Sequence, residues 1–308
     1  MKNIVIIADS SVDLNEQRRK EARIAGYVKG ILTRPDGSQF YADCDWQNMT
    51  PSDYFDSMKK GKAMYKSATG TLNETIEAFE KELAKGNDII AITIGSAFSA
   101  VNNLFNSAKN LLEEKYPERS IRIVDSMRYS GGYALLCYRA KDLIEEGKDI
   151  DEIVDTLNKE KNCIHQIGVL DDLFFLNKSG RITKTIAVMG TMVGVRPMAD
   201  FYPNGFASVI GKVKGEKNAL GVAVKYINKT IRNNKYIIIA DSNRVTEADY
   251  YEEIIRKDVK ADNIIRTSVG QVSGANIGPG LVAAFYFGDE VTSDSEKEKK
   301  IFEEALNS

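Results

Sequence analysis

The stretch IIAITIGSAFSAVNNLFNSA, residues 89–108, predicts the fold of the first half of the chain. Its first six residues form a nearly continuous apolar run, which is typical of a parallel strand buried on both faces. Small turn residues follow at positions 95–99, and apolar residues then recur at the spacing of one helix face: Val101, Leu104, Phe105 and Ala108. The turn should therefore lie at the carboxyl end of a strand, where helix N–H groups attract anions. Ser99 is a candidate anion-binding residue, although serine is also a common helix cap that needs no ligand.

The composition is that of a folded protein with two domains. The chain has 308 residues, of which 43% are hydrophobic and 28% charged. Its 42 basic and 44 acidic side chains give a net charge of −2, which argues against a nucleic-acid partner. No apolar run reaches the roughly 18 residues of a membrane span, so we expect at most transient membrane contact. The first strand, with its apolar run at residues 4–7, ends at Asp9 and is too short for the core of a signal peptide, so we expect a cytoplasmic protein.

Cysteine and histidine usage excludes several kinds of site. Cys44, Cys137 and Cys163 are odd in number and widely spaced, which argues against a disulfide framework and against a zinc site. His165 is the single histidine, and this excludes most histidine-based metal and triad chemistry. We therefore expect neither a metal ion nor a cofactor.

Residues 1–162 are predicted to form an N-terminal α/β domain with a mainly parallel sheet and helices on both faces. Strands and helices alternate in this half: strands near 4–9, 27–32, 89–94 and 119–124, and helices near 15–25, 51–60, 72–83, 101–108, 135–146 and 150–161. A turn at residues 35–37 that leads into residues 38–41 predicts a hairpin-like excursion. The dipeptide Asp-Ser closes three hydrophobic strands of the chain, at 9–10, 125–126 and 241–242. Because Asp and Ser bond to nearby backbone N–H groups, we interpret this repetition as turn chemistry.

Residues 163–308 are predicted to form an α+β domain with a mixed sheet. Two runs, 197–202 and 206–212, flank Pro203, Asn204 and Gly205, which is a hairpin signal. The remaining pattern predicts further elements: helices at 171–177, 183–193, 216–233, 247–257 and 296–306, strands at 236–240, 263–269 and 281–287, and a glycine-rich loop at 273–280.

Four loops, taken in order, resemble the DegV family of bacterial fatty-acid-binding proteins. They are residues 9–14 (DSSVDL), residues 175–182 (FLNKSGRI), residues 195–198 (VRPM) with Asn204 and Gly205, and residues 277–281 (IGPGL). Their spacing covers nearly the whole chain. The resemblance implies a two-domain α/β carrier that holds one long-chain fatty acid, such as palmitate, stearate or oleate, in a cleft between its domains. It also implies a fatty acid kinase subunit as a partner, which phosphorylates the bound carboxylate.

The resemblance assigns carboxylate-binding roles to three residues. Ser67 occupies the first position of a turn that usually reads Thr-Ser-Gln-Pro-Ser, and Ser99 matches the serine of Leu-Ser-Gly-Thr. Asn276 stands where the family commonly has a histidine, two positions before the Gly-Pro-Gly loop. Asparagine can donate a hydrogen bond but cannot carry the histidine's charge.

The resemblance also indicates where the acyl tail and the kinase would contact the chain. Tail-lining candidates come from the apolar faces of residues 182–193 and 281–287, namely Ile182, Ile186, Met189 and Leu281. Each of them could equally be an ordinary core residue. Arg181 matches the arginine of the family's Gly-Arg-Ile motif, which is expected to face the kinase, and a surface ion pair is an equal alternative for it.

A small-molecule hydrolase or phosphotransfer enzyme is the alternative class. Asp9 follows a hydrophobic strand, as an aspartyl nucleophile would, but such enzymes need a second acid two residues on, where this chain has Ser11. A hydrolase built on Ser99 would need His165 to fold back onto it. No nucleotide-binding glycine motif follows any strand.

Overall fold

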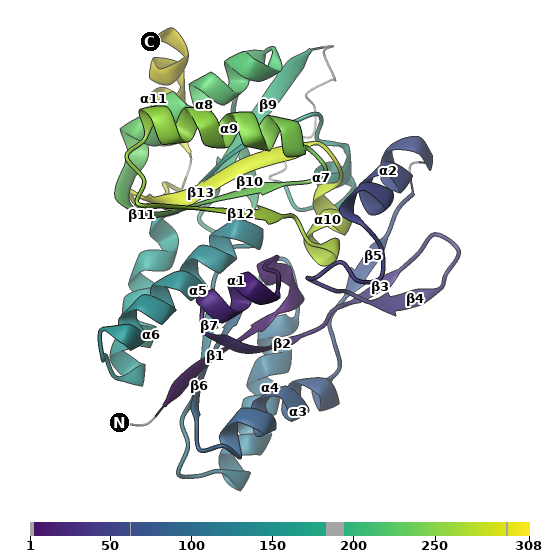
Figure 1. Cartoon of the computed structure of the whole chain (residues 1–308), viewed down its shortest axis with the longest axis vertical. Coiled ribbons are helices and arrows are strands. Elements are labelled where there is room, and N and C mark those ends of the chain that lie inside the picture. Colours follow the sequence, from purple (N-terminus) through teal and green to yellow (C-terminus); the bar gives the residue numbers. More distant parts are fainter. Residues whose placement is uncertain (1–2, 62, 183–193, 294) are drawn as a thin grey trace. The chain divides into compact units, whose positions relative to one another are not determined.

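A computed structural model describes residues 3–61, 63–182, 194–293 and 295–308 (Figure 1). Its contacts divide the chain into two compact units. Unit 1 comprises Met1–Asn48, Tyr65–Lys161 and Gly270–Val272, and unit 2 comprises Met49–Met64, Asn162–Val269 and Ser273–Ser308. The predicted domains, 1–162 and 163–308, are contiguous ranges. The units differ from them in that residues 49–64 and 162 group with unit 2 and residues 270–272 with unit 1.

Unit 1 is organised around a four-stranded parallel sheet in the order β2-β1-β6-β7. Every residue of β6 is buried, as its apolar run predicts. The strands are β1 (Ile4–Asp9), β2 (Ile24–Val28), β6 (Asp88–Thr93) and β7 (Ile121–Asp125). The chain goes from β1 to one side and then returns to the other, so the topological switch point lies between β1 and β6. Ligands of open α/β sheets bind at the carboxyl end of such a point.

Helices cover both faces of this sheet, which confirms the predicted fold class (Figure 1). One pair packs together on the sheet, α3 (Leu72–Leu83) with α4 (Val101–Lys115), and so does a second pair, α5 (Ser130–Glu145) with α6 (Ile150–Glu160). Thr71 and Glu74 form a capping box at the start of α3, and Asp149 and Glu152 form one at the start of α6. The short helices η1 (Ser10–Val12) and α1 (Glu16–Glu21) follow β1.

Unit 1 also contains a separate three-stranded antiparallel sheet, of which only the hairpin around residues 35–37 was predicted. Its order is β4-β3-β5, with β3 (Ile31–Thr33), β4 (Gln39–Tyr41) and β5 (Lys66–Ala68). The single strand predicted over residues 27–32 is therefore wrong, because this range contains the end of β2 and the start of β3. The helix predicted over residues 15–25 is also shorter, since it ends at Glu21 and β2 begins at Ile24.

Unit 2 contains a six-stranded mixed sheet in the order β10-β9-β8-β13-β11-β12. Only β11 and β12 run parallel to each other among these neighbours, and the hairpin predicted around residues 203–205 joins β9 to β10. The strands are β8 (Ile164–Leu170), β9 (Val195–Phe201), β10 (Ala207–Lys214), β11 (Ile231–Asp241), β12 (Asn263–Ser268) and β13 (Leu281–Gly288). The helices are α2 (Pro51–Gly61), α7 (Phe174–Ser179), α8 (Glu216–Thr230), α9 (Val245–Asp258) and α11 (Glu296–Asn307). α10 (Gln271–Ile277) belongs to unit 2 from Ser273 onward, and η2 (Lys161–Cys163), whose first residue belongs to unit 1, precedes β8.

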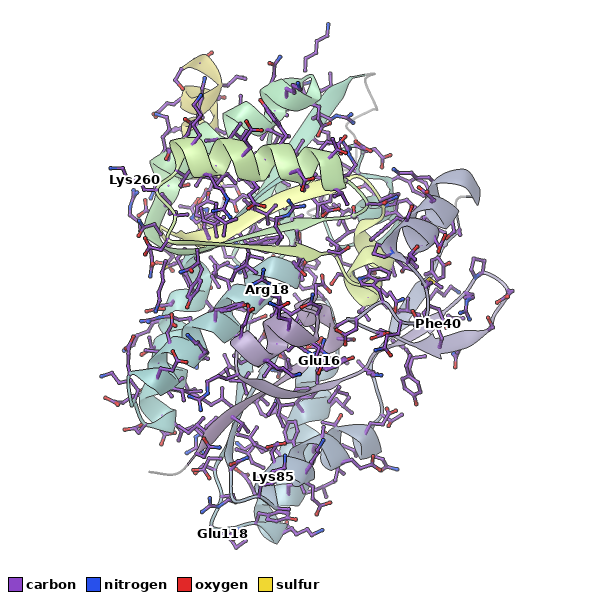
Figure 2. All side chains as sticks on the ribbon, viewed as in Figure 1. Glu16, Arg18, Phe40, Lys85, Glu118 and Lys260 are labelled. Atoms are coloured by element: carbon purple, nitrogen blue, oxygen red, sulfur yellow. The ribbon has the colours of Figure 1, made fainter. Side chains whose placement is uncertain are left out.

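The core of unit 2 lies between this sheet and the helices α8, α9 and α11 (Figure 1). Alternate residues of β13, among them Val282, Ala284 and Tyr286, belong to that core. Charged side chains such as those of Glu16, Lys85 and Lys260 are exposed on their units (Figure 2).

The prediction of a glycine-rich loop over residues 273–280 is wrong for most of its length, because residues 271–277 form α10. Gly274 is required for packing: an added Cβ would lie 2.9 Å from the Phe55 ring of α2. Gly278, with φ of 78°, follows the helix and donates its N–H to the Gly274 carbonyl at 2.8 Å, as glycines after helices commonly do. The helix predicted over residues 183–193 lies outside the described residues.

Candidate functional site

Ser99 lies at the carboxyl end of β6, directly before α4. The turn that carries it is fixed on both sides: Gly95 donates its N–H to the Arg128 carbonyl at 2.9 Å, and the Phe98 ring meets the Tyr129 ring edge-on at 5.5 Å. Ser99 is half-buried, and its hydroxyl makes no hydrogen bond with any residue in the described ranges. Ala100, the N-cap of α4, contributes no side-chain bond to the helix. Among the described residues, the Ser99 hydroxyl and the first N–H groups of α4 are therefore donors without a side-chain partner.

Asp9 organises this edge of the sheet. Its Oδ2 accepts the Ile94 N–H and its Oδ1 accepts the Ser11 N–H, both at 2.8 Å, so one buried carboxylate joins the ends of β1 and β6. The Tyr133 hydroxyl accepts the Asp9 N–H at 3.0 Å and donates to the Ile92 carbonyl. Burial raises the pKa of Asp9 despite these bonds. Asp9 thus supports the loops at the switch point, and Tyr133, which no local sequence pattern indicates, supports Asp9.

Ser67 lies in β5, opposite Leu32 of β3. Leu32 is fully buried, and residues that pair directly across a sheet point to the same face. Ser67 therefore shares the inner face of the small sheet, and it is half-buried. Ser10 connects this sheet to the end of β1, because its hydroxyl accepts the Gly30 N–H at 3.0 Å. Gly30 in turn lies close to β5, since an added Cβ at Gly30 would be 3.1 Å from the Ala68 carbonyl. The end of β1 and its loop are therefore bonded to the segment that leads to Ser99, through Asp9, and to Gly30, which lies beside the strand that carries Ser67.

Asn276 belongs to unit 2, near the end of α10, and is half-buried. Its carbonyl accepts the Ser179 hydroxyl of α7 at 3.2 Å. The structure thus places Ser67 and Ser99 in one unit and Asn276 in the other. Each remains a predicted carboxylate-binding residue.

Two of the four tail-lining candidates fall on described residues. Ile182 is buried beside Ala207 at the start of β10, and Leu281 is buried at the start of β13. Because Val282 belongs to the core under α8 and α9, alternation puts Leu281 on the opposite face of the sheet, together with Ala283. Gly168 pairs with Ala283, and an added Cβ there would lie 3.1 Å from Leu281 Cδ1. Small residues therefore adjoin Leu281 on this face. Ile186 and Met189 lie outside the described residues.

Arg181 follows α7 and is half-buried. Its guanidinium donates to the Ser179 carbonyl, and its own carbonyl accepts the Ala207 N–H at 3.3 Å. Its role as a partner contact stays a prediction. Among the described residues, no group of three or more His, Cys, Asp or Glu side chains could hold a metal ion.

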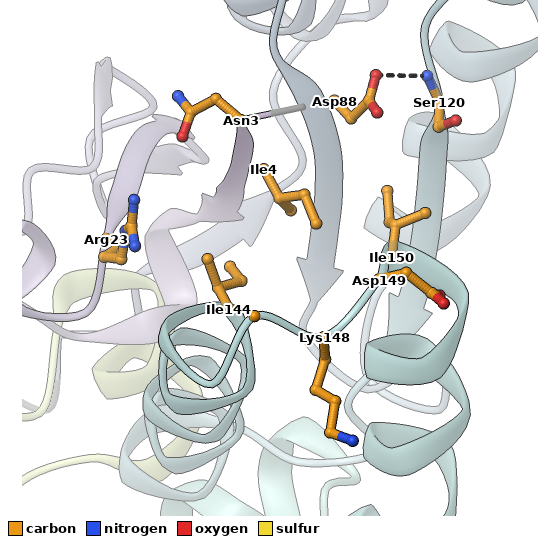
Figure 3. A pocket seen from close by; sticks show the side chains of 10 residues that line it. Asn3, Ile4, Arg23, Asp88, Ser120, Ile144, Lys148, Asp149 and Ile150 are labelled. Atoms are coloured by element: carbon orange, nitrogen blue, oxygen red, sulfur yellow. Dashed lines mark hydrogen bonds between the residues drawn. The ribbon is translucent and has the colours of Figure 1, made fainter. Parts of the chain in front are cut away.

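A pocket of about 490 Å³ lies at the other end of the unit 1 sheet, where β1 and β6 begin (Figure 3). Ile4, Ile144 and Ile150 line it together with charged residues. Its carboxylates already accept backbone N–H groups: Asp88 from Ser120 at 3.0 Å, and Asp149 from the first turn of α6. Ligands of parallel sheets bind at the carboxyl end of the strands, so we do not assign the function to this pocket.

In the described part of the chain, no helix has both the length and the apolar character that crossing a membrane requires.

Comparisons with known proteins place this geometry in a family. Residues 3–289 match a family described as "Uncharacterised protein, DegV family". A DegV domain-containing protein of Clostridium perfringens is 31% identical over 291 residues, which cover 94% of this chain and 99% of that protein. The solved structure of the fatty acid kinase (Fak) B3 protein of Streptococcus pneumoniae, loaded with linoleic acid, aligns with a TM-score of 0.79 at 23% identity and covers 93% of this chain and 100% of that one. A DegV family protein of Eubacterium eligens, loaded with heptadecanoic acid, aligns with a TM-score of 0.80 at 20% identity, with 93% and 100% coverage. These matches span nearly the whole sequence, and the chain belongs to the DegV family.

Proposed function

We propose that this protein binds one long-chain fatty acid and holds its carboxylate with the side chains of Ser67, Ser99 and Asn276. The observation that carries the proposal is the Ser99 hydroxyl, half-buried and without a partner in the described residues, at the start of a helix that has no side-chain cap. A carboxylate in an apolar site is costly unless its oxygens accept hydrogen bonds. Hydroxyl groups and helix N–H groups can supply these bonds without a buried cation.

The affinity would come from the tail. Each methylene removed from water contributes roughly 0.8 kcal/mol, so a chain of about sixteen carbons could gain on the order of 10 kcal/mol before association costs. We assign tail contacts to Ile182 and Leu281, and to Ile186 and Met189 from the sequence pattern. The fatty acids bound by the Streptococcus and Eubacterium proteins support this ligand class.

The first test is native mass spectrometry of the protein as purified, followed by palmitate titration of Ser99→Ala. We expect a co-purified fatty acid in the wild type, and an affinity at least about tenfold lower in the variant because a hydrogen bond to a charged group is lost. Ser107→Ala is the matched control, since Ser107 is an exposed serine of α4, the helix that follows Ser99, and its hydroxyl donates to the Asn103 carbonyl of that helix. Equal affinity of Ser99→Ala and wild type would remove Ser99 from the site.

We further propose that the protein is a carrier without catalysis of its own and presents the fatty acid to a kinase. The Fak B3 protein among its structural neighbours supports this role. Arg181→Ala should then leave palmitate affinity unchanged and slow phosphorylation of the bound lipid by a cognate kinase. A collapse of palmitate binding would instead place Arg181 in the lipid site.

The enzyme alternative finds less support in the geometry. Both carboxylate oxygens of Asp9 accept backbone N–H groups, so this side chain acts as a structural bridge. His165, the only histidine of the sequence, lies in unit 2 with both ring nitrogens bonded. Neither group is poised as a nucleophile or as a base for Ser99.

A further inference from the structure

The turn over residues 241–244 in unit 2 joins β11 to α9 and contacts several other elements of that unit. Asp241 accepts the Arg244 N–H at 2.9 Å and so starts α9. Asn243, with φ of 61°, donates to Asp56 of α2 at 3.1 Å. Ser242 is fully buried and makes three bonds to the residues where β13 begins. Its hydroxyl accepts the Leu281 N–H at 2.8 Å, its carbonyl accepts the Gly280 N–H at 3.1 Å, and its N–H donates to the Leu281 carbonyl at 2.9 Å.

Arg244 lies at the centre of an ion network. Its guanidinium contacts the carboxylate of Asp171, which follows β8, and it reaches Glu216 at 3.0 Å and Glu247 at 3.1 Å. Only 10% of the Arg244 side chain is exposed. Burial opposes its charge, but the bonds to these carboxylates outweigh burial and raise the pKa of Arg244. Arg196 is a second cation in the network and contacts Asp171 at 2.6 Å and Glu216 at 2.7 Å.

Asp171 connects this ion network to the Gly-Pro-Gly segment, residues 278–280. Its N–H donates to the Gly280 carbonyl at 3.1 Å, and an added Cβ at Gly280 would lie 2.6 Å from the Asp171 carboxylate. Gly280 has φ of 99°, a conformation that favours glycine. Gly280 is therefore held between Asp171 on one side and Ser242 on the other.

The other end of the same segment carries Asn276. Its carbonyl is bonded to Ser179, and the next glycine, Gly278, packs directly against the Phe175 ring of α7. Residues 276–281 are thus fixed at both ends by contacts within unit 2, and Pro279 limits the freedom of the chain between them. A shift of Gly280 would move the backbone that carries Asn276.

We propose that Ser242 and Arg244 are positioning residues, which set the place of Asn276 for the ligand carboxylate through residues 276–281. The inference rests on the proposed function, since it concerns the same ligand. Hydrogen bonds to a carboxylate weaken steeply with misalignment, so a small displacement of the asparagine lowers affinity. Neither residue contacts the ligand in this proposal.

Arg244→Gln is the principal test, because Arg196 remains to neutralise Asp171 and Glu216. We expect palmitate affinity to fall about tenfold, within the range of coupling seen between interacting residues. Arg256→Gln is the matched control, since it removes the same charge from an exposed position of the same helix. Ser242→Ala is the second variant in case Arg244→Gln fails to fold, and it should lower affinity in the same direction.

A double-mutant cycle distinguishes positioning of Asn276 from a general destabilisation of the protein. If Arg244 acts through Asn276, Arg244→Gln should lower affinity less than about twofold in an Asn276→Ala background. An equal loss in both backgrounds, or wild-type affinity in Arg244→Gln and Ser242→Ala, would overturn the inference. These outcomes leave the proposed function standing so long as the wild type binds palmitate. A wild type that binds no fatty acid would instead refute the proposed function.

Discussion

The imidazole of His165 lies between two acceptors in unit 2. Nδ1 is 2.6 Å from the Asp200 carboxylate, and Nε2 is 2.8 Å from the Asp289 carbonyl. Both nitrogens can donate only in the protonated ring. Asp200 also accepts the Tyr226 hydroxyl at 2.8 Å, and the Tyr286 ring stacks on His165 at 5.6 Å. Burial opposes the charged ring, but Asp200, the Asp289 carbonyl and the more distant Glu298 outweigh burial and raise the pKa of His165.

This raised pKa predicts that part of the protein's free energy of unfolding is lost as the pH rises through the folded-state pKa of His165. A group whose pKa is higher in the folded state contributes fully below its unfolded pKa, about 6.5 for histidine, and this contribution disappears as pH rises through the folded value. The free energies of unfolding of wild type and His165→Gln should therefore differ most below about pH 6.5. Urea unfolding between pH 5.5 and pH 9 measures the difference. If the difference in the free energy of unfolding stays constant or grows as the pH rises, the His165 ring is not held in its charged form by the fold.

Residue chemistry at strand ends could be predicted from sequence, because it depends on near neighbours. The interpretation of the three Asp-Ser pairs as turn chemistry is confirmed: Asp9, Asp125 and Asp241 each accept a backbone N–H two or three residues on. The distant partners of the same residues could not be predicted. The bond from Ile94 to Asp9 spans 85 positions, and the one from Leu281 to Ser242 spans 39. Local patterns carry no information on such pairings.

At the scale of elements, continuous apolar runs such as β6 and β13 were predictable because both are buried along their whole length. The prediction for α10 was wrong because the glycines at 274, 278 and 280 argue locally for a loop, whereas Gly274 lies inside the helix and is required by the approach of the Phe55 ring. The packing of α11 on the sheet likewise requires a glycine, because of a side chain that is distant in the sequence. Phe302 of α11 is buried against β10, at a position where Gly211 has no side chain.

Gly211→Ala should destabilise unit 2, since an added Cβ would overlap the Phe302 ring. Overpacking of this kind costs about 1–3 kcal/mol. Gly221→Ala is the control: it lies inside α8 with no atom within 4 Å of an added Cβ, so it should be neutral or stabilise by about 0.5–1 kcal/mol. Thermal unfolding of both variants checks the prediction. The double variant Gly211→Ala with Phe302→Leu should recover part of the loss, and no recovery would mean that the strain lies elsewhere.

For the whole molecule, the division of the chain into units depends on two short segments that sequence patterns could not assign. Residues 49–64 precede most of unit 1 in the sequence but group with unit 2. The periodicity of α2 predicts a helix there, and it cannot say which core receives the helix. Within unit 2, the fully buried residues Tyr54 and Phe55 lie against Gly274 of α10, and Asp56 accepts a bond from Asn243.

A fragment of residues 163–308, the contiguous domain that the sequence suggests, should therefore fail to fold cooperatively. It lacks α2, and burial of two aromatic side chains contributes roughly 1.5–3 kcal/mol each, which is a large part of the 5–15 kcal/mol that stabilises a typical domain. Joining residues 49–64 to this fragment through a flexible linker should restore a cooperative urea transition and near-ultraviolet circular dichroism. The same fusion with Tyr54→Ala and Phe55→Ala is the matched control and should remain unfolded. A cooperative transition in the bare fragment would show that α2 contributes little to the core of unit 2, and the contacts at Gly274 would then be incidental to its stability.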